Sequence, residues 1–354
     1  MPFERDENDL VEAYYEKGWT DGLPVVPPTR EKVNALLRAA GLAPDEIMGE
    51  VAPNYGDATA EKVAINAVMA GCAPEHMPLV AACVRAMVDE KFNLHAVGGM
   101  TDSASPLVIV NGLAREAGGI NCGSGVFGNG TRGNAVVGRA LMLVLANIGG
   151  SRPGGISRTM FGSPARYTYC IGENEEESPW EPLHADRGLK AEMGAVTLFP
   201  CEAPREIRIE GVTGAEEMAD ILGRSMCTIW SADRHLIGTS GVILALGPLH
   251  ASIFGRAGWS KNATRNVIYQ AALMPGEKGG HPRRKFQAPE ALTIVVAGGT
   301  GGIYSMLMPG IADYMGTNMV TRPVSNLGDK RNKNGGVSAT AKTRTKGDRN
   351  ARAF

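Results

Sequence analysis

The first quarter of the chain has the apolar spacing of amphipathic helices. Between residues 33 and 40, apolar side chains recur at the three- and four-residue intervals that place them on one helix face. Thr29 stands before this run as an N-cap, and Gly41 follows it as a left-handed C-cap. The same pattern repeats from Thr59 to Gly71, and Pro78 suits the first turn of another helix. We therefore expect three consecutive helices here.

Further along, the apolar pattern changes to short runs that are typical of strands. The first covers residues 107–112, and the later ones read VTLF, IRIEGV, VILALG and TIVVAGG. Helical spacing returns between them at 134–148, at about 214–226 and at about 260–272. Strands that alternate with helices favour an α/β fold with some parallel pairing. We expect an α/β protein with a mixed sheet and buried helices, folded as two lobes.

The expected lobes divide near residue 190. Residues 1–190 should form a helix-rich lobe that contains a glycine-rich turn, and residues 191–325 an α/β lobe. The last segment, 326–354, is polar, basic and poor in apolar residues, so it cannot bury enough surface to offset its ordering entropy. It should form a flexible tail, or an arm ordered on a neighbouring subunit, with weak binding of nucleic acid or of an acidic partner as the alternative.

Composition narrows the class of protein. The chain has 354 residues, of which 44% are apolar. Its 36 basic and 37 acidic residues give a net charge of −1, which does not favour nucleic-acid binding as its main role. No apolar run reaches the roughly 18–20 residues that cross a bilayer, and the acidic start lacks the charge pattern of an export signal. We expect a cytoplasmic protein whose six cysteines are reduced and mostly buried.

Residues 122–150 combine a glycine-rich turn with a helix that is apolar on almost every side. Such a helix is buried, so the N–H groups at its start need an acceptor inside the protein. One interpretation is a bound carboxylate or phosphate, held by the helix dipole with Arg132, Asn134 and Arg139. The other is tight packing, with Arg139 paired to an internal carboxylate. The G-x-G-x-x-G spacing at 123–128 does not predict a dinucleotide site, because no strand ends beside it and no acidic residue follows at the ribose position.

A second polar turn lies in INAVMAGCAPEHMPLV, residues 65–80. Cys72 and His76 are four residues apart and can meet if the turn is helical, which would activate the thiol as a nucleophile. A cysteine buried as a small apolar residue is the alternative interpretation. Cys72 and His76 are therefore candidate catalytic residues.

An acidic loop, ENEEESPWEPLH, directly follows the short strand that ends at about Ile171. Glu173 and Asn174 lie nearest the strand end, where ordered loops build sites, so we predict a catalytic role for the first and substrate binding for the second. Glu181 and His184 have the ExxH spacing of metal ligands, but an intervening proline argues against a regular helix. His184 is also a candidate catalytic residue for proton transfer. A solvated loop is the alternative, and no metal or other cofactor is identified.

Two more candidates follow strands of the second lobe. VILALGPLH reads as a strand that leads into a helix with His250 in its first turn. The positive end of that helix lowers the pKa of the imidazole and favours the neutral form, which can act as a base. A polar residue that fills the helix start is the alternative. TIVVAGG leads to Tyr304 and Ser305, beyond the carboxyl end of a strand, where α/β sheets bind ligands.

Four stretches together resemble a bacterial protein family: GWTDGLPVVPPT, INAVMAGCAPEHMPLV, NAVVGRALMLVLANIGG and CIGENEEESPWEPLH. The family is associated with, or fused to, the UGSC domain, a module named for a selenocysteine or cysteine in a [UC]-G-S-C motif. The resemblance spans residues 15–310. This chain lacks that motif, and its nearest string, CGSG at 122–125, lacks the final cysteine. It therefore corresponds to the partner module.

The resemblance implies a metabolic enzyme, or the larger subunit of one, that works with thiol or selenol chemistry on a small molecule. With the glycine-rich turn, it leads us to expect lyase- or hydrolase-type chemistry on an anionic, carboxylate-bearing substrate. One alternative is a non-catalytic ligand-binding or scaffold subunit of a redox complex, and another is a metal-dependent enzyme that uses Glu173, Glu181 and His184. The extended N-terminal arm and the basic tail predict a homo-oligomer, and a UGSC-domain protein is a candidate partner.

Overall fold

The structure is a computed structural model that describes the chain in four stretches, 7–230, 241–274, 281–311 and 318–327. The helices of the first half are α1 (Glu7–Glu16), α2 (Arg30–Ala40), α3 (Ala60–Ala70), α4 (Met77–Met87), α5 (Leu94–Gly99), α6 (Leu113–Ala117), α7 (Arg132–Asn147) and α8 (Leu183–Asp186). Those of the second half are α9 (Ala215–Met226), α10 (Pro248–Arg256) and α11 (Lys261–Ala271).

Two four-stranded sheets, both mixed, form the centre of the molecule. The first has the order β12 (Val320–Pro323), β5 (Ala195–Cys201), β3 (Ser105–Asn111), β4 (Cys170–Gly172), in which only β3 and β4 are parallel. The second has the order β10 (Leu292–Val296), β7 (Val242–Leu246), β11 (Tyr304–Pro309), β6 (Arg205–Arg208), in which only β10 and β7 are parallel. Two small hairpins complete the strands: β1 (Ile47–Val51) with β2 (Gly56–Thr59), and β8 (Leu273–Met274) with β9 (Arg283–Arg284). The α/β fold expected from the sequence is confirmed.

The capping residues predicted for two helices of the first quarter are confirmed at both ends of each helix. The side chain of Thr29 accepts a hydrogen bond from a backbone N–H at the start of α2, and Gly41 ends that helix in the left-handed conformation. Thr59 and Gly71 do the same for α3. α7 begins two residues before the expected 134–148, so Asn134 lies inside its first turn.

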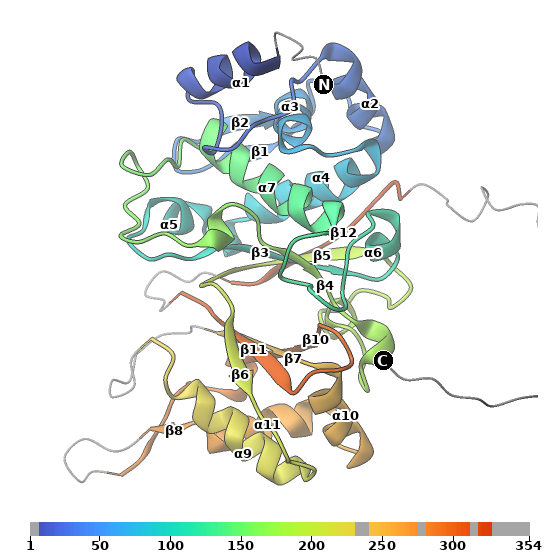
Figure 1. Cartoon of the computed structure of the whole chain (residues 1–354), viewed down its shortest axis with the longest axis vertical. Helices are drawn as coiled ribbons and strands as arrows, with labels where there is room; N and C mark the ends of the chain where they lie inside the picture. Colours follow the sequence, from blue (N-terminus) through green and yellow to red (C-terminus); the bar gives the residue numbers. More distant parts are fainter. Residues whose placement is uncertain (1–6, 231–240, 275–280, 312–317, 328–354) are drawn as a thin grey trace, which may run out of the picture.

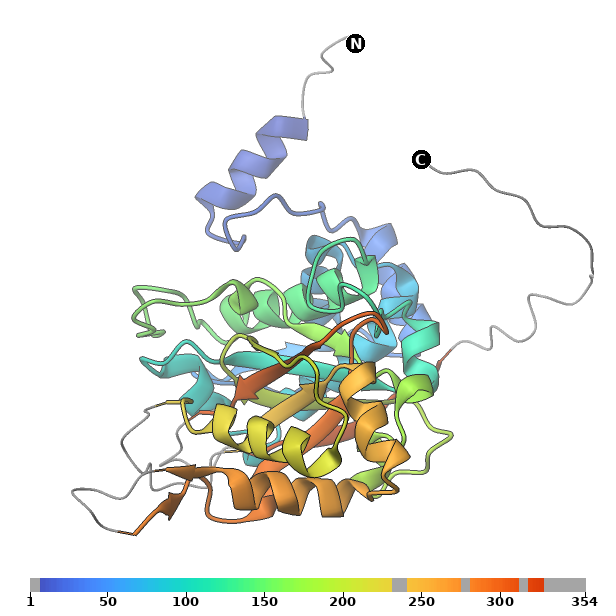
Figure 2. The same ribbon diagram turned by 60° about the horizontal axis from the view of Figure 1, so that its bottom comes forward.

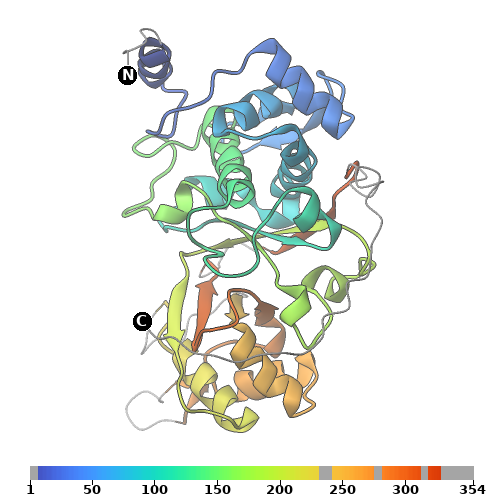
Figure 3. The same ribbon diagram turned by 45° about the vertical axis from the view of Figure 1, so that its right-hand side comes forward.

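Alternate residues of the central strands enter different cores. In β3, Val108 and Val110 face the helices of the first half, whereas Leu107 and Ile109 lie in a core between the two sheets. In β7, Leu244 faces α9, α10 and α11, and its neighbours contribute to the core between the sheets. The molecule therefore has four layers in the order helices, sheet, sheet, helices (Figure 1; Figure 3).

The chain passes from the first sheet to the second between β5 and β6. β5 belongs to the first sheet because Val196 and Leu198 complete the core beneath the first-half helices, while Phe199 on its other face packs between the sheets. The chain then builds the second sheet and returns to the first through β12. The predicted basic tail falls outside the described residues from position 328 on.

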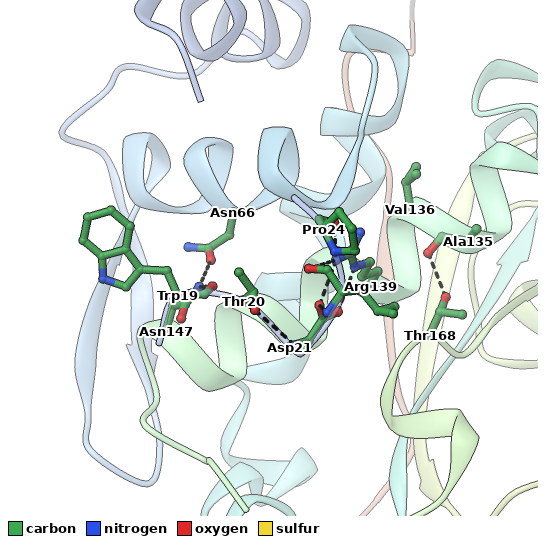
Figure 4. Close-up of polar contacts among 12 residues, drawn as sticks. Trp19, Thr20, Asp21, Pro24, Asn66, Ala135, Val136, Arg139, Asn147 and Thr168 are labelled. Carbon is green, nitrogen blue, oxygen red and sulfur yellow. Dashed lines mark hydrogen bonds and ion pairs between the residues drawn. The ribbon is translucent and has the colours of Figure 1, made fainter. Parts of the chain in front are cut away.

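A proline-rich strap, residues 19–29, crosses the helices α3 and α7 (Figure 4). The N–H of Val26 donates to the carbonyl of Met69 in α3 at 3.1 Å. The amide of Asn147 in α7 donates to the carbonyl of Trp19 at 2.9 Å. Figure 2 shows α1 standing beside the body, with the strap as its connection to the rest of the ribbon. No helix in the described stretches is long and apolar enough to cross a membrane.

Candidate functional site

The carboxyl ends of the parallel strands of both sheets meet at one edge of the molecule. The N–H of Asn174, just beyond β4, donates to the carbonyl of Val296 at the end of β10 at 2.7 Å, and its side-chain amide donates to the carbonyl of Gly298 at 3.2 Å. Gly298 in turn donates its N–H to the carbonyl of Cys122 at 2.9 Å. This strand-end edge is where α/β proteins bind ligands, because the loops that follow parallel strands gather there.

Glu173 is the central residue of this edge. Its side chain is fully buried, and Oε2 accepts hydrogen bonds from the amide of Asn111 at 2.6 Å and from the N–H of Leu183 at 2.8 Å. The other oxygen, Oε1, has no hydrogen-bond partner within the described residues. Burial raises the pKa of the carboxyl to about 7, against the lowering effect of the Lys261 ammonium and of the two donors. A carboxyl group with this pKa can both donate and accept a proton near neutral pH.

Asn111, at the end of β3, places its amide between two carboxylates. Besides Glu173, it donates to Oε1 of Glu175 at 3.0 Å, which also accepts the N–H of Gly112 at 2.7 Å. The carbonyl oxygen of the Asn111 side chain is itself buried without a partner in the described part of the chain. The side chain is therefore held through its two N–H donors, while its oxygen makes no hydrogen bond within the described residues.

Arg115, in α6, holds the acidic loop against this edge. It makes a two-pronged ion pair with Glu176, at 2.7 and 2.9 Å, and a longer contact with Glu175 at 3.3 Å. Burial alone would lower the pKa of the guanidinium, but the two carboxylates more than offset it and raise the pKa. The same guanidinium lies 3.5 Å from the sulfur of Cys122, which is partly exposed. Asn111, Arg115 and Cys122 were not predicted, although Asn111 could have been found as the polar residue that ends an apolar strand.

His184 and Glu181 do not form a metal site with Glu173. His184 is buried, with Nε2 3.1 Å from the carbonyl of Ala191 and Nδ1 without a partner among the described residues, whereas the Glu181 side chain is exposed. Lys261 instead donates to the Glu181 carbonyl and to the Asp186 carboxylate, both at 2.6 Å. In the described residues no group of three or more His, Cys, Asp or Glu side chains is placed to hold a metal ion.

A cavity of about 490 Å³ opens beside Asn174 at the same edge. Its wall is formed by residues 124–128, 297–299, 301–302 and 304–306, together with Ala245 and Gly247. Tyr304, predicted to bind substrate, lies in this wall and is partly exposed. The cavity volume is in the range of small-molecule sites.

His250 and Ser305, predicted separately, contact each other. The Ser305 hydroxyl is 2.8 Å from Nδ1 of His250, and Nε2 is 3.2 Å from the carbonyl of Ile209. Burial lowers the pKa of His250, and a carbonyl can only accept, so the neutral ring carries its hydrogen on Nε2 and Nδ1 accepts from Ser305. Ser305 pairs with Leu246 in the sheet and so shares its helix-facing side, while Met306 pairs with Ala245 on the cavity side. The pair therefore fastens β11 to α10 at the cavity wall, to which Ser305 belongs.

Cys72 and His76 are engaged with different groups. The Cys72 sulfur is 3.5 Å from the carbonyl of Val136 in α7, and burial raises the pKa of the thiol to about 12. Nδ1 of His76 accepts the N–H of Ala73 at 2.8 Å, and burial lowers the pKa of the imidazole. This geometry matches the packing alternative for the turn.

The three side chains predicted to hold an anion at the start of α7 all bond to the protein. Arg132 donates to the carbonyl of Gly71, which ends α3, and Asn134 exchanges hydrogen bonds with the backbone of Asn121. Arg139 pairs with Asp21 of the strap at 2.7 and 2.8 Å (Figure 4). These contacts fit the alternative of tight packing with Arg139 paired to an internal carboxylate.

No protein-family model and no curated protein matches the chain.

Proposed function

We propose that the chain is a small-molecule enzyme of the lyase or hydrolase type that transfers a proton through Glu173. The observation that carries the proposal is the buried Glu173 carboxyl at the strand-end edge, with a pKa of about 7 and no partner for Oε1 in the described residues. A group with a pKa near the operating pH is the most effective general acid or base. Buried carboxyls with shifted pKa values are concentrated at functional sites.

The neighbours of Glu173 support the same role. The amide of Asn111 and the N–H of Leu183 both bind Oε2, so they fix the carboxyl and leave Oε1 for a reacting group. The positive charge of Lys261 limits the rise in pKa, which keeps ionised and protonated forms both populated near neutral pH.

The proposal does not require an anionic substrate. Arg132, Arg139 and Arg115 all bond to protein acceptors, so none of them supplies an unpaired positive charge at the strand-end edge. The proposal therefore specifies only the proton that Glu173 exchanges. This proton is on a substrate carbon next to a carbonyl group, or on a water molecule that attacks the substrate.

The test compares Glu173→Gln with Glu177→Gln, a change in the same loop on an exposed side chain. Each protein is incubated in D₂O with a panel of small hydroxy acids, keto acids, esters and amides, and proton NMR records exchange and product formation. Loss of exchange and turnover by about 100-fold or more in Glu173→Gln alone is expected. Equal turnover in the parent and Glu173→Gln, or a Glu173 carboxyl that titrates near 4.5 by carbon-13 NMR, rejects the role.

A second proposal is that the chain is the larger, ligand-binding subunit of a thiol or selenol enzyme whose partner carries the UGSC motif. Its support is the resemblance of four long stretches to the UGSC-associated family, and the partly exposed Cys122 at the strand-end edge gives it a point of contact. Co-purification with a UGSC-domain protein, and turnover only in the mixture, would distinguish this role from catalysis by the chain alone. Homo-oligomerisation stays a prediction, and light scattering of the same preparation would test it.

A further inference from the structure

The cavity at the strand-end edge has an unusual wall. Each residue that forms it, within the described part of the chain, is uncharged, and seven of them are glycines. Apolar side chains line its inner side, with Ala245, Ala297 and Met306 from the second sheet and Val126 and Phe127 from the glycine-rich turn. A charged ligand would lose its hydration here without gaining an ion pair, which is costly.

The glycines leave space where other residues would place side chains. A Cβ atom added at Gly125, Gly298 or Gly301 would meet no atom within 4 Å, so the chain is open at all three positions. At Gly298 the backbone has φ of 99°, a conformation that favours glycine and keeps this part of the wall free of a side chain. The result is a set of flat peptide surfaces with two aromatic side chains, Phe127 and Tyr304, beside them.

We propose that this cavity binds a neutral, ring-bearing organic molecule. A planar ring can lie against the peptide planes and contact Phe127, and aromatic contacts of this kind add to apolar burial. The hydroxyls of Ser124 and Tyr304, both exposed to solvent at the cavity, offer hydrogen bonds to one polar end of the molecule. Binding of such a ligand does not depend on proton transfer by Glu173, so the two proposals fail separately.

The test uses two fluorescent probes that share one ring skeleton. N-phenyl-1-naphthylamine is neutral, and 8-anilinonaphthalene-1-sulfonate carries one negative charge. The full chain should bind the neutral probe at least about tenfold more tightly in a fluorescence titration. Equal affinities, or preference for the sulfonate, would overturn the assignment of a neutral ligand.

Two variants locate the binding. Gly301→Leu enters open space without a strained backbone and narrows the cavity, so it should weaken binding of the neutral probe by about tenfold or more. Gly214→Leu, at an equally open glycine before α9, is the matched control and should leave binding unchanged. Met306→Lys adds a cation to the wall and should shift the preference toward the sulfonate. If Gly301→Leu binds like the parent, or if the control weakens binding equally, the cavity is not the site.

Discussion

The start of α7 and the strand-end edge both bury many polar side chains, but they satisfy them differently. Around α7, Asn134 uses its oxygen and its nitrogen on backbone groups, and Arg139 bonds a carboxylate and two strap carbonyls. At the strand ends, Glu173 Oε1, Asn111 Oδ1 and His184 Nδ1 are buried with no partner in the described residues. Each such atom costs about 1–3 kcal/mol of stability.

This difference separates packing from function. Paired polar groups around α7 tie the strap to the helices and so belong to the fold. Unpaired ones lower the free energy of unfolding, and at the end of parallel strands a ligand can supply the missing hydrogen bonds. The strand-end edge is therefore the better candidate for chemistry, although the α7 region holds more arginine.

The largest effect is expected from breaking the α7 network. Arg139→Leu should lower the free energy of unfolding by about 4 kcal/mol, because the Asp21 carboxylate, only 12% exposed, loses its ion-pair partner and keeps only the N–H of Leu23 as a donor. Urea unfolding at pH 7 measures the loss. Arg224→Leu is the control, since its pair with Asp220 is more than half exposed and should change stability by less than about 0.5 kcal/mol. Similar losses of stability in the two variants would show that the Arg139 pair stabilises the fold no more than an exposed ion pair does.

Glu173→Gln, at the strand ends, should have a smaller effect of opposite sign: it should raise the free energy of unfolding at neutral pH. The pKa of Glu173 is about 7 in the folded protein against 4.5 for the free side chain, so the folded state holds an extra proton between these values. The stability that this proton provides is present below pH 4.5 and falls as the pH rises, by about 3 kcal/mol once the pH exceeds 7. The side chain at position 173 cannot ionise in Glu173→Gln, so this variant should not lose stability in this way as the pH rises.

Urea unfolding at intervals from pH 4.5 to pH 8 tests this linkage. The stability of Glu173→Gln should rise relative to the parent across that range, and Glu177→Gln should track the parent. Parallel curves for the parent and Glu173→Gln would show that the Glu173 carboxyl is not perturbed. The combination of a more stable and inactive variant would indicate that Glu173 is kept for its chemistry.

Local patterns in the sequence predicted many of the helices and strands, but they missed β11, which was expected to be a loop, and did not predict the assembly. Capping residues and apolar spacing depend on neighbours in the chain, so Thr29 and Gly41 mark the ends of α2 correctly. The face-to-face packing of two sheets depends on which side of β3 meets which side of β7, and apolar runs with no polar alternation carry no such information.

The candidate site was predicted only in part for the same reason. Glu173 and Asn174 were selected from the sequence because they directly follow a strand, which requires no knowledge of distant contacts. The anion site at α7 was expected because Arg132 and Arg139 flank a buried helix start, but sequence could not show that Gly71 and Asp21 would bond them. Partners that are distant in the chain decide whether a charge is available.

The smallest of the expected effects concerns the thiols that belong to the two regions. Cys72 contacts α7, is buried and has a pKa raised to about 12, whereas Cys122 is partly exposed at the strand-end edge. Alkylation requires an accessible thiolate, so iodoacetamide should modify Cys122 at least about 100-fold faster than Cys72 in the native protein at pH 7.5. Mass spectrometry of the digested protein measures both rates, and unfolding in urea should make them similar. If Cys72 reacts as fast as Cys122 before unfolding, the turn before α4 is accessible to small molecules. Catalysis by Cys72 would then be as well supported as catalysis at the strand-end edge.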